Sequence, residues 1–271
     1  MAQLHELEKE YILKNYSLFG PKLVANELGR SQSTIINFAK KNNLEIDKEN
    51  KLTEFDLPKF NYNLDFSKCF DNITKELAYW LGFFWADGYI KGNVLIIEIV
   101  EEDGLILESL FNSIFPFKIY KRSRENRKPQ MSFSITNKQI ASKLTDLGKY
   151  PHSTESHQKV FDFLDTDELK LYFLRGLIDG DGNFYVNSEY GQFSITSSIN
   201  QDWTCLLEYL KEFNPNVRTE NKTNKYSQFR ITGKDNLIRF INFLQYNSIS
   251  VGLTRKEEKA KQILELYNNK P

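Results

Sequence analysis

Apolar residues near the start of the chain recur three and four positions apart, which is the spacing of an amphipathic helix. They predict a first helix over residues 5–16. Pro21 suits the start of a second helix over 21–28, because proline lacks an N–H and the first turn of a helix leaves its N–H groups without helical partners. Gly29 suits the end of that helix. A third helix is predicted over about 31–42. The chain therefore begins with a small all-α unit.

The turn between the second and third of these helices is typical of a helix-turn-helix. Ala25 and Ile35 stand at its packing positions, and Gly29 supplies the tight turn. Ser31 caps the third helix, whose outward positions are polar or basic, as a helix in the DNA major groove requires. The residues expected to reach DNA from this helix are Gln32, Ser33, Asn37 and Lys40. Residues 1–46 are predicted to bind DNA, and a small helical bundle without a ligand is the alternative.

The next segment, residues 47–72, has no sustained hydrophobic period and contains Pro58. We expect a linker there, with one short segment that docks on a neighbouring unit.

The rest of the chain is an internal duplication. WLGFFWADG at 80–88 and LRGLIDGDG at 174–182 align without gaps, and FSITNK at 133–138 aligns with FRITGK at 229–234. The segments that begin at Asp103 and Asp202 align between these blocks. Three blocks in the same order predict two related repeats. Their expected bounds are 73–160 and 161–271.

Each repeat has the pattern of a helix, two strands, a helix, two strands and a final helix. The opening helices are expected over about 74–87 and 167–181, where apolar residues follow a helical period. The first strand pairs are expected over about 89–100 and 184–198, and the second over 117–136 and 217–232. The predicted fold is α+β, with two pseudo-twofold αββαββα repeats that form a saddle-shaped sheet surface for DNA.

The charge of the chain is balanced in sum, with 36 Lys and Arg against 36 Asp and Glu, but it is unevenly distributed. Residues 118–128 hold six basic side chains and one acidic, and residues 217–239 hold six and two. Both segments fall on the second strand pair of a repeat, so we expect one basic surface suited to a duplex. The candidate DNA-binding residues are Lys118, Lys121, Arg122, Arg124, Lys222, Lys225 and Arg230.

Composition excludes several other classes of protein. Hydrophobic residues make up 40% and charged residues 27% of the chain, which excludes disorder and fibrous folds. The two cysteines form no metal or disulfide pattern, which indicates a reducing compartment, and the three histidines share no ligand spacing. No apolar run approaches a membrane span, and the acidic start is unlike a targeting peptide. A cytoplasmic location is expected.

The opening helices of the repeats carry the candidate chemistry. Gly82 and Ala86 stand four apart in one, as Gly176 and Gly180 do in the other, so the two backbones can approach closely. Asp87 and Asp181 then fall in the last turns, where the helix dipole disfavours a negative charge. If the helices pair, the two carboxylates converge and repel each other, and a divalent cation offsets both costs.

Oxygen ligands with open water positions suit Mg²⁺, and we expect Mn²⁺ to substitute for it. The alternative is that each Asp-Gly is only a turn dipeptide. Two such Asp-Gly sites occur at matching repeat positions, each beside a basic hairpin, and this favours a metal site over a simple turn. Paired carboxylates, metal ions and a basic groove are the components of phosphodiester hydrolysis.

The segments WLGFFWADG and LRGLIDGDG resemble the two motifs of single-chain LAGLIDADG homing endonucleases. The resemblance covers about residues 73–267. It implies a site-specific, metal-dependent double-strand DNA endonuclease that leaves short 3′ overhangs, with a helix-turn-helix as an accessory DNA-binding module. A bacterial or phage origin is expected. The implied protein is a monomer with a long, asymmetric target.

The resemblance also implies roles for residues at the ends of the motifs. Asp87 and Asp181 are the expected metal ligands and catalytic acids, with the backbone carbonyls of Ala86 and Gly180 as helpers. A basic residue is expected near the active site after the last helix of each repeat. The second repeat offers Lys256, beside Arg255, as a catalytic residue.

The chain departs from the family pattern in two places. The sixth motif position is Trp85 in the first repeat and Asp179 in the second, and we interpret Trp85 as a packing residue. The first repeat offers only Lys149 and Lys159 as counterparts of Lys256, which predicts unequal activity on the two strands.

Glu101 is expected to be a solvated acid at a helix start. A role for Glu101 in positioning water is the alternative.

Two other functions on the same fold stay open from the sequence. One is a DNA-binding regulator that does not cleave, against which the presence of both Asp87 and Asp181 argues. The other is an intron maturase that binds structured RNA, against which the duplex-reading helix-turn-helix argues.

Overall fold

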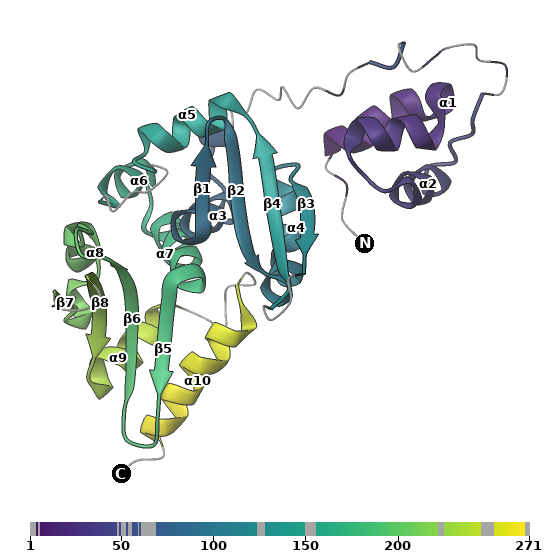
Figure 1. Cartoon of the computed structure of the whole chain (residues 1–271). Helices are drawn as coiled ribbons and strands as arrows, with labels where there is room; N and C mark the ends of the chain where they lie inside the picture. The colour runs from purple at the N-terminus through teal and green to yellow at the C-terminus, as the bar shows by residue number, and fades with distance from the viewer. Residues whose placement is uncertain are drawn as a thin grey trace.

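The chain folds into an N-terminal helical unit followed by two similar α+β repeats (Figure 1). The computed structural model describes residues 4, 6–47, 49, 53, 56–58, 60, 69–123, 128–149, 156–221, 225–244 and 252–268. Within these residues no helix is both long and apolar enough to cross a membrane.

The N-terminal unit contains the three predicted helices. Helix α1 (Glu6–Leu28) is broken at Gly20, whose backbone angles are not helical (φ 72°, ψ 171°), and Pro21 begins the second half. Gly29 (φ 62°) makes the turn to α2 (Gln32–Lys41). The side chain of Ser31 accepts the Thr34 N–H, which confirms it as the N-cap of α2.

Part of the following segment packs on these helices. Leu57 joins their hydrophobic core. The Tyr11 hydroxyl donates to the Pro58 carbonyl at 2.5 Å, and the Phe60 N–H donates to Glu27 Oε1 at 2.9 Å. Burial, with the nearby Glu27 carboxylate, raises the pKa of Tyr11 to about 12. A docking segment was expected between residues 47 and 72, and these contacts lie within that stretch.

The first repeat contains two pairs of strands separated by helices, as predicted. Its elements are α3 (Lys75–Asp87), β1 (Gly88–Lys91), β2 (Val94–Val100), α4 (Glu101–Ile114), β3 (Lys118–Arg122), β4 (Gln130–Thr136), α5 (Lys138–Asp146) and α6 (Gln158–Phe163). The strands form an antiparallel sheet in the order β1-β2-β4-β3.

The second repeat has the same sheet order, β5-β6-β8-β7, and all its pairs are antiparallel. Its elements are α7 (Asp167–Asp181), β5 (Gly182–Val186), β6 (Gly191–Ser198), α8 (Thr204–Tyr209), η2 (Lys211–Phe213), β7 (Asn216–Glu220), β8 (Tyr226–Thr232), α9 (Lys234–Phe243) and α10 (Thr254–Asn268). The α+β fold with two related repeats is confirmed.

The ends of the repeats differ from the predicted pattern. Where one final helix was expected, each repeat has two: α5 and α6 in the first, α9 and α10 in the second. The added helix α10 has its own buried face, which includes Ala260, Ile263 and Tyr267. The expected boundary at residue 160 lies inside α6, whose Val160 and Phe161 are buried.

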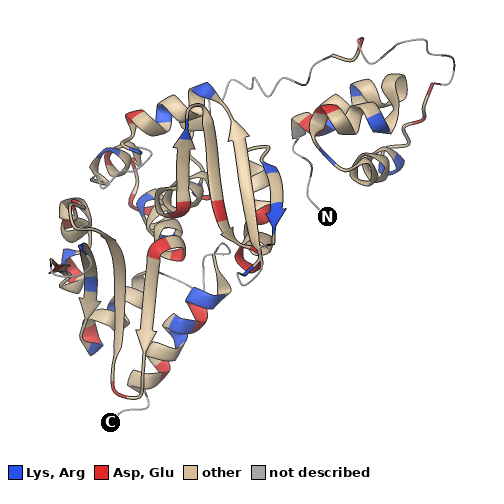
Figure 2. Ribbon diagram, viewed as in Figure 1, with Lys and Arg blue, Asp and Glu red and all other residues tan. Residues whose placement is uncertain are grey.

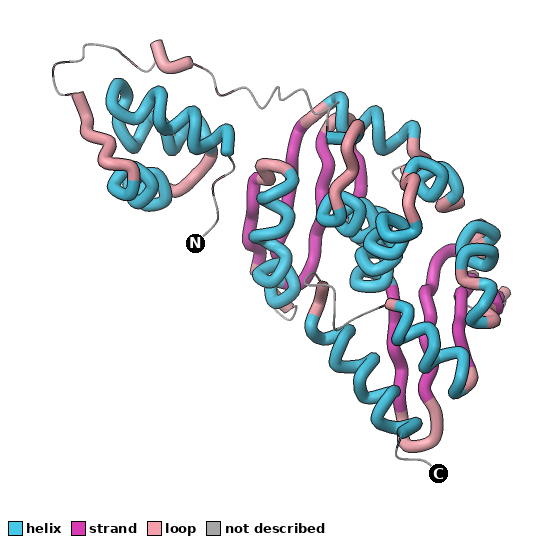
Figure 3. Tube along the Cα trace, turned by 180° about the vertical axis from the view of Figure 1, so that it is seen from behind, coloured by secondary structure: helices cyan, strands magenta, loops and turns pink. Residues whose placement is uncertain are grey.

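Each sheet has one face covered by helices and one open face. In β2, Leu95, Ile97 and Ile99 are buried against the helices, and the alternate residues point away from them. Figure 1 looks onto the open faces, and Figure 3, seen from behind, shows the helices in front of the strands. Both open faces therefore lie on the same side of the molecule.

Helices α3 and α7 pack together at the centre through glycine. A Cβ on Gly82 would overlap the Phe173 carbonyl oxygen, and one on Gly176 would overlap the Tyr79 carbonyl oxygen. The two backbones touch directly, as the small-residue spacing predicted. No rotamer change relieves such an overlap, because both partners are main-chain atoms.

We expect Gly176→Ala to lower the free energy of unfolding by at least about 3 kcal/mol, because the helices must separate to admit the methyl group. Chemical denaturation followed by circular dichroism measures the change. Gly104→Ala is the comparison, since Gly104 is also helical but its added Cβ would meet side-chain atoms, Met131 Sδ at 2.6 Å and Met131 Cβ at 2.8 Å, so a smaller loss is expected there. Equal losses in the two variants would contradict this account of the interface.

Candidate functional site

The site is built where α3 and α7 end side by side. Helix α3 ends at Asp87, and β1 begins at the next residue, Gly88. Helix α7 ends at Asp181, and β5 begins at Gly182. Both glycines have extended backbone, so neither helix continues past its aspartate. The close helix packing therefore carries the two carboxylates to the junction of the repeats.

The two carboxylates lie at the crowded junction of the helices, where Asp87 is partly buried and Asp181 is exposed. A Cβ on Gly180 would be 3.1 Å from Asp87 Oδ2, so the Asp87 side chain lies against the end of the opposite helix. Burial raises the pKa of Asp87 to about 6, and the charge of Asp181 contributes to that rise. Burial also raises the pKa of Asp181, against the opposing effect of Lys149 and Lys256.

Two buried lysines flank the carboxylates, one from each repeat. Lys149 is 7% exposed, and its Nζ donates to the Trp85 carbonyl at 2.8 Å. Lys256 is 8% exposed, and its Nζ donates to the Gly182 carbonyl. Burial lowers the pKa of each lysine to about 8, and the neighbouring aspartates oppose that shift.

The sequence had left the basic residue of the first repeat undecided between Lys149 and Lys159. Lys149 is the one beside the aspartates, whereas Lys159 is exposed at the start of α6. Lys256 lies in the first turn of α10, and not after the last helix as expected, because the segment beyond α9 forms a further helix.

The first turn of α10 is held from both repeats. Arg255 makes a bidentate ion pair with Asp103 of α4, with Nη2 to Oδ2 at 2.8 Å and Nε to Oδ1 at 3.0 Å. Asp179 Oδ2 accepts the Leu253 N–H at 2.9 Å and the Tyr79 hydroxyl at 2.8 Å. Asp179 is therefore a structural anchor for the segment that carries Lys256.

The donor set of this site fits a hard divalent cation. Asp87 and Asp181 supply carboxylates whose charges are costly without a cation, as their raised pKa values show. The carbonyls of Ala86 and Gly180 lie in the last helical turns, where no further helical N–H follows. No group of three or more His, Cys, Asp or Glu ligands occurs among the described residues. Two carboxylates completed by water and phosphate are typical of Mg²⁺.

Strand register decides which of the predicted basic residues share the open face of the first sheet. Lys118, opposite Ser134, and Arg122, opposite Gln130, lie on the open face. Lys121 has the opposite parity, lies at the edge and pairs with Glu101 at 2.5 Å. Glu101 is thus an ion-pair partner. Figure 2 shows basic residues on β3 and on the first part of α10.

The remaining candidates in the second repeat and in α2 are distributed as follows. Arg230 lies on the open face of β8 and contacts Gln192, and Lys225 is exposed just before that strand. The four predicted residues of α2 are all exposed, and they are Gln32, Ser33, Asn37 and Lys40. Arg124 and Lys222 lie outside the described residues.

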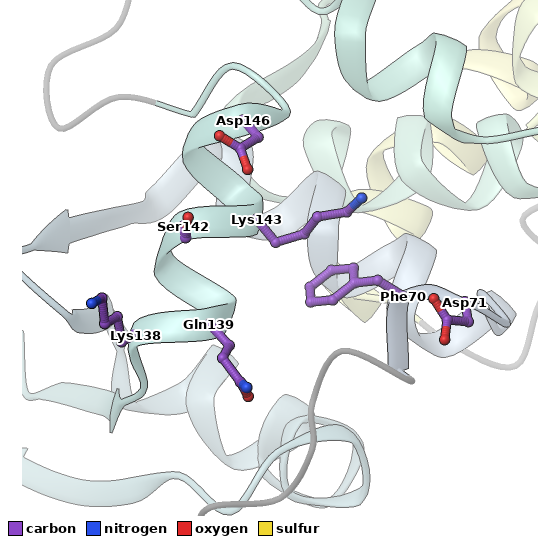
Figure 4. Close-up of a pocket in the computed structure, with 7 residues that line it drawn as sticks. All are labelled: Phe70, Asp71, Lys138, Gln139, Ser142, Lys143 and Asp146. Carbon is purple, nitrogen blue, oxygen red and sulfur yellow. The ribbon is translucent and has the colours of Figure 1, made fainter.

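A surface pocket beside α5 is separate from this site. Figure 4 shows its lining of Phe70 and Asp71 against Lys138, Gln139, Ser142, Lys143 and Asp146. None of these residues belongs to the predicted site.

Comparison with known proteins agrees with the sequence motifs. Residues 168–244, most of the second repeat, match the family model described as a LAGLIDADG-like domain. A point mutant of I-SmaMI is similar in structure, with 14% sequence identity, 73% of this chain and 92% of that chain covered, and a TM-score of 0.51. Meganuclease I-SmaMI bound to uncleaveable DNA with a TTCT central four is also similar in structure. The sequence identity is 14%, 73% of this chain and 93% of that chain are covered, and the TM-score is 0.50.

The I-LtrWI LAGLIDADG homing endonuclease bound to target DNA matches at 15% identity over 74% of this chain and 99% of that chain, with a TM-score of 0.48. No curated protein matches the sequence. Residues 168–244 therefore match a LAGLIDADG-like domain, and the fold of the chain is similar to that of I-SmaMI, in agreement with the sequence motifs.

The raised pKa of Asp87 predicts a stability cost at the site. A buried carboxylate destabilises the fold where it is ionised, so the cost is full above about pH 6 and absent below about pH 4. We expect Asp87→Asn, measured in EDTA, to raise the free energy of unfolding by about 1 to 3 kcal/mol at pH 8. The gain should shrink toward zero near pH 4.

Thermal and denaturant unfolding at both pH values measure this effect. Asp146→Asn is the matched control, because Asp146 also ends a helix, α5, but is exposed. A loss of stability in Asp87→Asn at pH 8 would show that burial and the charge of Asp181 do not destabilise the ionised carboxylate there.

Proposed function

We propose that the protein is a metal-dependent, site-specific DNA endonuclease that cuts both strands of a duplex. The observation that carries the proposal is the pair of carboxylates at the helix ends, the partly buried Asp87 and the exposed Asp181, between two open sheet faces on one side of the molecule. Two sheets joined at a central acidic site give a duplex one continuous surface with its phosphates near the carboxylates. I-SmaMI, which is similar in fold, is bound to DNA in the structure with a TTCT central four.

Asp87 and Asp181 would hold Mg²⁺ or Mn²⁺ between the helix ends, with the carbonyls of Ala86 and Gly180 as additional oxygen donors. When bound, such an ion lowers the pKa of a water nucleophile and stabilises the leaving oxygen. Such a charge would also offset the burial that raises the pKa of both aspartates and the repulsion from Asp181 that adds to it at Asp87. Cleavage across the minor groove, with short 3′ overhangs, is the outcome that we propose.

Lys149 and Lys256 each bring an ammonium to the edge of this site. Because burial lowers the pKa of both to about 8, each can hold a proton near a phosphate and exchange it at neutral pH. The lysines bond to different carbonyls, of Trp85 and of Gly182, so the two strands face unequal surroundings. We infer that the two cuts differ in rate.

The open faces would contact the DNA backbone and bases. Lys118 and Arg122 in the first repeat, and Lys225 and Arg230 in the second, are placed to neutralise phosphates. Lys121 is paired with Glu101 on the other side of the sheet, so we leave it out of this interface. A monomer with two non-identical repeats would recognise a long, asymmetric target.

The N-terminal unit would add contacts outside the cleavage centre. Its α2 presents Gln32, Ser33, Asn37 and Lys40 to solvent, while Ile35 and Ala39 are buried against α1. A capped helix with one buried and one polar face is the form of a recognition helix.

Cleavage of DNA from the source locus, with ends mapped by sequencing, tests the proposed reaction. We expect one cut site with 3′ overhangs in Mg²⁺ or Mn²⁺ and none in EDTA. Asp87→Asn and Asp181→Asn should each lower the rate at least about 1000-fold, and Lys256→Met about 100-fold. Asp146→Asn, on exposed α5, is the control and should cleave normally.

Other results would point to the alternative functions. Specific binding with intact DNA in both metals would indicate a regulator. Competition of DNA binding by structured intron RNA would indicate a maturase.

A binding titration at several salt concentrations tests the N-terminal unit. Lys40→Ala should weaken binding several-fold and reduce the slope of log K against log salt by about 1, because one phosphate contact is lost. Asn37→Ala should weaken binding without changing that slope. Lys14→Ala, on the exposed face of α1, is the comparison. Unchanged affinity in both α2 variants would remove this unit from the interface.

A further inference from the structure

The second strands of the two repeats, β2 and β6, can be compared position by position. Gly88, at the end of the first motif, is paired with Ile97, and Gly182, at the end of the second, is paired with Ile195. Ile97 of β2 is therefore the structural counterpart of Ile195 of β6. Side chains at even steps from this position share a buried face, and those at odd steps share the open face.

The open faces of these two strands have opposite character. In β2 the open face carries three β-branched apolar residues, which are Val94, Ile96 and Val100. Their counterparts in β6 are all polar: Gln192 and Ser198 are partly exposed, whereas Ser194 is buried. The fourth pair is Glu98 and Thr196. The repeats thus share two buried apolar positions, Leu95 with Phe193 and Ile97 with Ile195, and differ in the polarity of the alternate positions.

The apolar residues of β2 do not belong to the hydrophobic core. They are partly exposed, and none is among the residues that form the core or pack against it. On the β4 side Val94 is paired with Thr136, Ile96 with Ser134 and Val100 with Gln130. On the β1 side Val94 is paired with Lys91 and Ile96 with Tyr89. Their methyl groups are therefore partly exposed on the open face, and we call Val94, Ile96 and Val100 the methyl stripe.

The surroundings of the methyl stripe match a polyanion with a few apolar groups. Lys118 and Arg122 flank it on β3, two strands away on the same open face. Glu98, between Ile96 and Val100, has its charge offset by Arg122 at 3.3 Å. In the DNA major groove the one apolar group on a base edge is the 5-methyl of thymine. A basic rim around an apolar stripe is complementary to that pattern.

The second sheet offers hydrogen bonds at the corresponding place. Arg230 contacts Gln192, and Gln228 Nε2 donates to Thr196 Oγ1 at 3.1 Å. Guanidinium and amide groups of this kind pair with the N7, O6 and N6 atoms of purines. The two open faces therefore differ in the base-edge chemistry that they can recognise.

We propose that the first repeat recognises its half of the target through thymine methyl groups that contact the methyl stripe, whereas the second repeat relies on hydrogen bonds to base edges. The inference rests on the proposed DNA-binding function and adds the basis of its asymmetric specificity. Loss of one buried methyl contact corresponds to about 0.8 kcal/mol, or about a fourfold change in affinity.

The experiment begins with duplexes selected from a randomised library by the full chain in Ca²⁺, followed by sequencing. Each thymine of the selected site is then replaced by uracil, which lacks only the methyl group. We expect about fourfold weaker binding per replacement at two or three positions of one half-site. Replacements in the other half-site should change affinity less than about twofold.

Variants assign the effect to the stripe. Ile96→Ser introduces the residue found at the matching position of β6, and it should abolish the penalty of uracil at one position. Ile106→Ser is the matched control, because Ile106 is an exposed isoleucine of α4 on the covered side of the sheet. That variant should keep the full uracil penalty.

The possible failures are distinguishable. If no specific sequence is selected, the proposed function itself fails. If a specific site is selected but uracil has no effect, or Ile96→Ser keeps the penalty of wild type, the methyl-stripe inference is overturned and the endonuclease proposal stands. Circular dichroism of Ile96→Ser confirms that the variant is folded.

Discussion

The structure depends on the direct backbone contact between α3 and α7. Gly82 and Gly176 each face a carbonyl oxygen of the opposite helix, so neither helix can move away without losing the centre of the fold. The same contact fixes where the helices end and therefore brings Asp87 and Asp181 together. The helix contact that stabilises the fold therefore also places two carboxylates where their negative charges are unfavourable. The proposed cation would turn that cost into binding energy.

The two repeats keep the same buried framework but differ in what they add around it. Asp179 ties α7 to the Leu253 N–H, whereas Trp85, its counterpart, packs against Phe173 and offers its carbonyl to Lys149. Divergence is thus concentrated at the site and on the open faces. Such a pattern is expected if the duplicated core serves folding and the rest serves recognition of an asymmetric duplex.

Local spacing predicted most of the fold, because caps, glycines and helical periods act over a few residues. The helix pair followed from the small residues spaced four apart, Gly82 with Ala86 and Gly176 with Gly180. What depends on long-range contacts was out of reach: the Asp103–Arg255 pair joins residues 152 apart, and Asp103 looks in the sequence like an ordinary helix-start acid. Lys121 was misleading, since its face depends on strand register. Lys149 was one of two candidates until the fold placed it.

The Asp103–Arg255 ion pair connects the two repeats next to the site. Arg255 precedes Lys256 in the first turn of α10, so the ion pair with α4 fixes the position of the lysine next to it. A residue of the first repeat therefore helps to place the basic group of the second. Because Asp179 holds the same turn from α7, Lys256 is positioned from both sides of the repeat junction. The geometry of the site thus depends on contacts from both repeats.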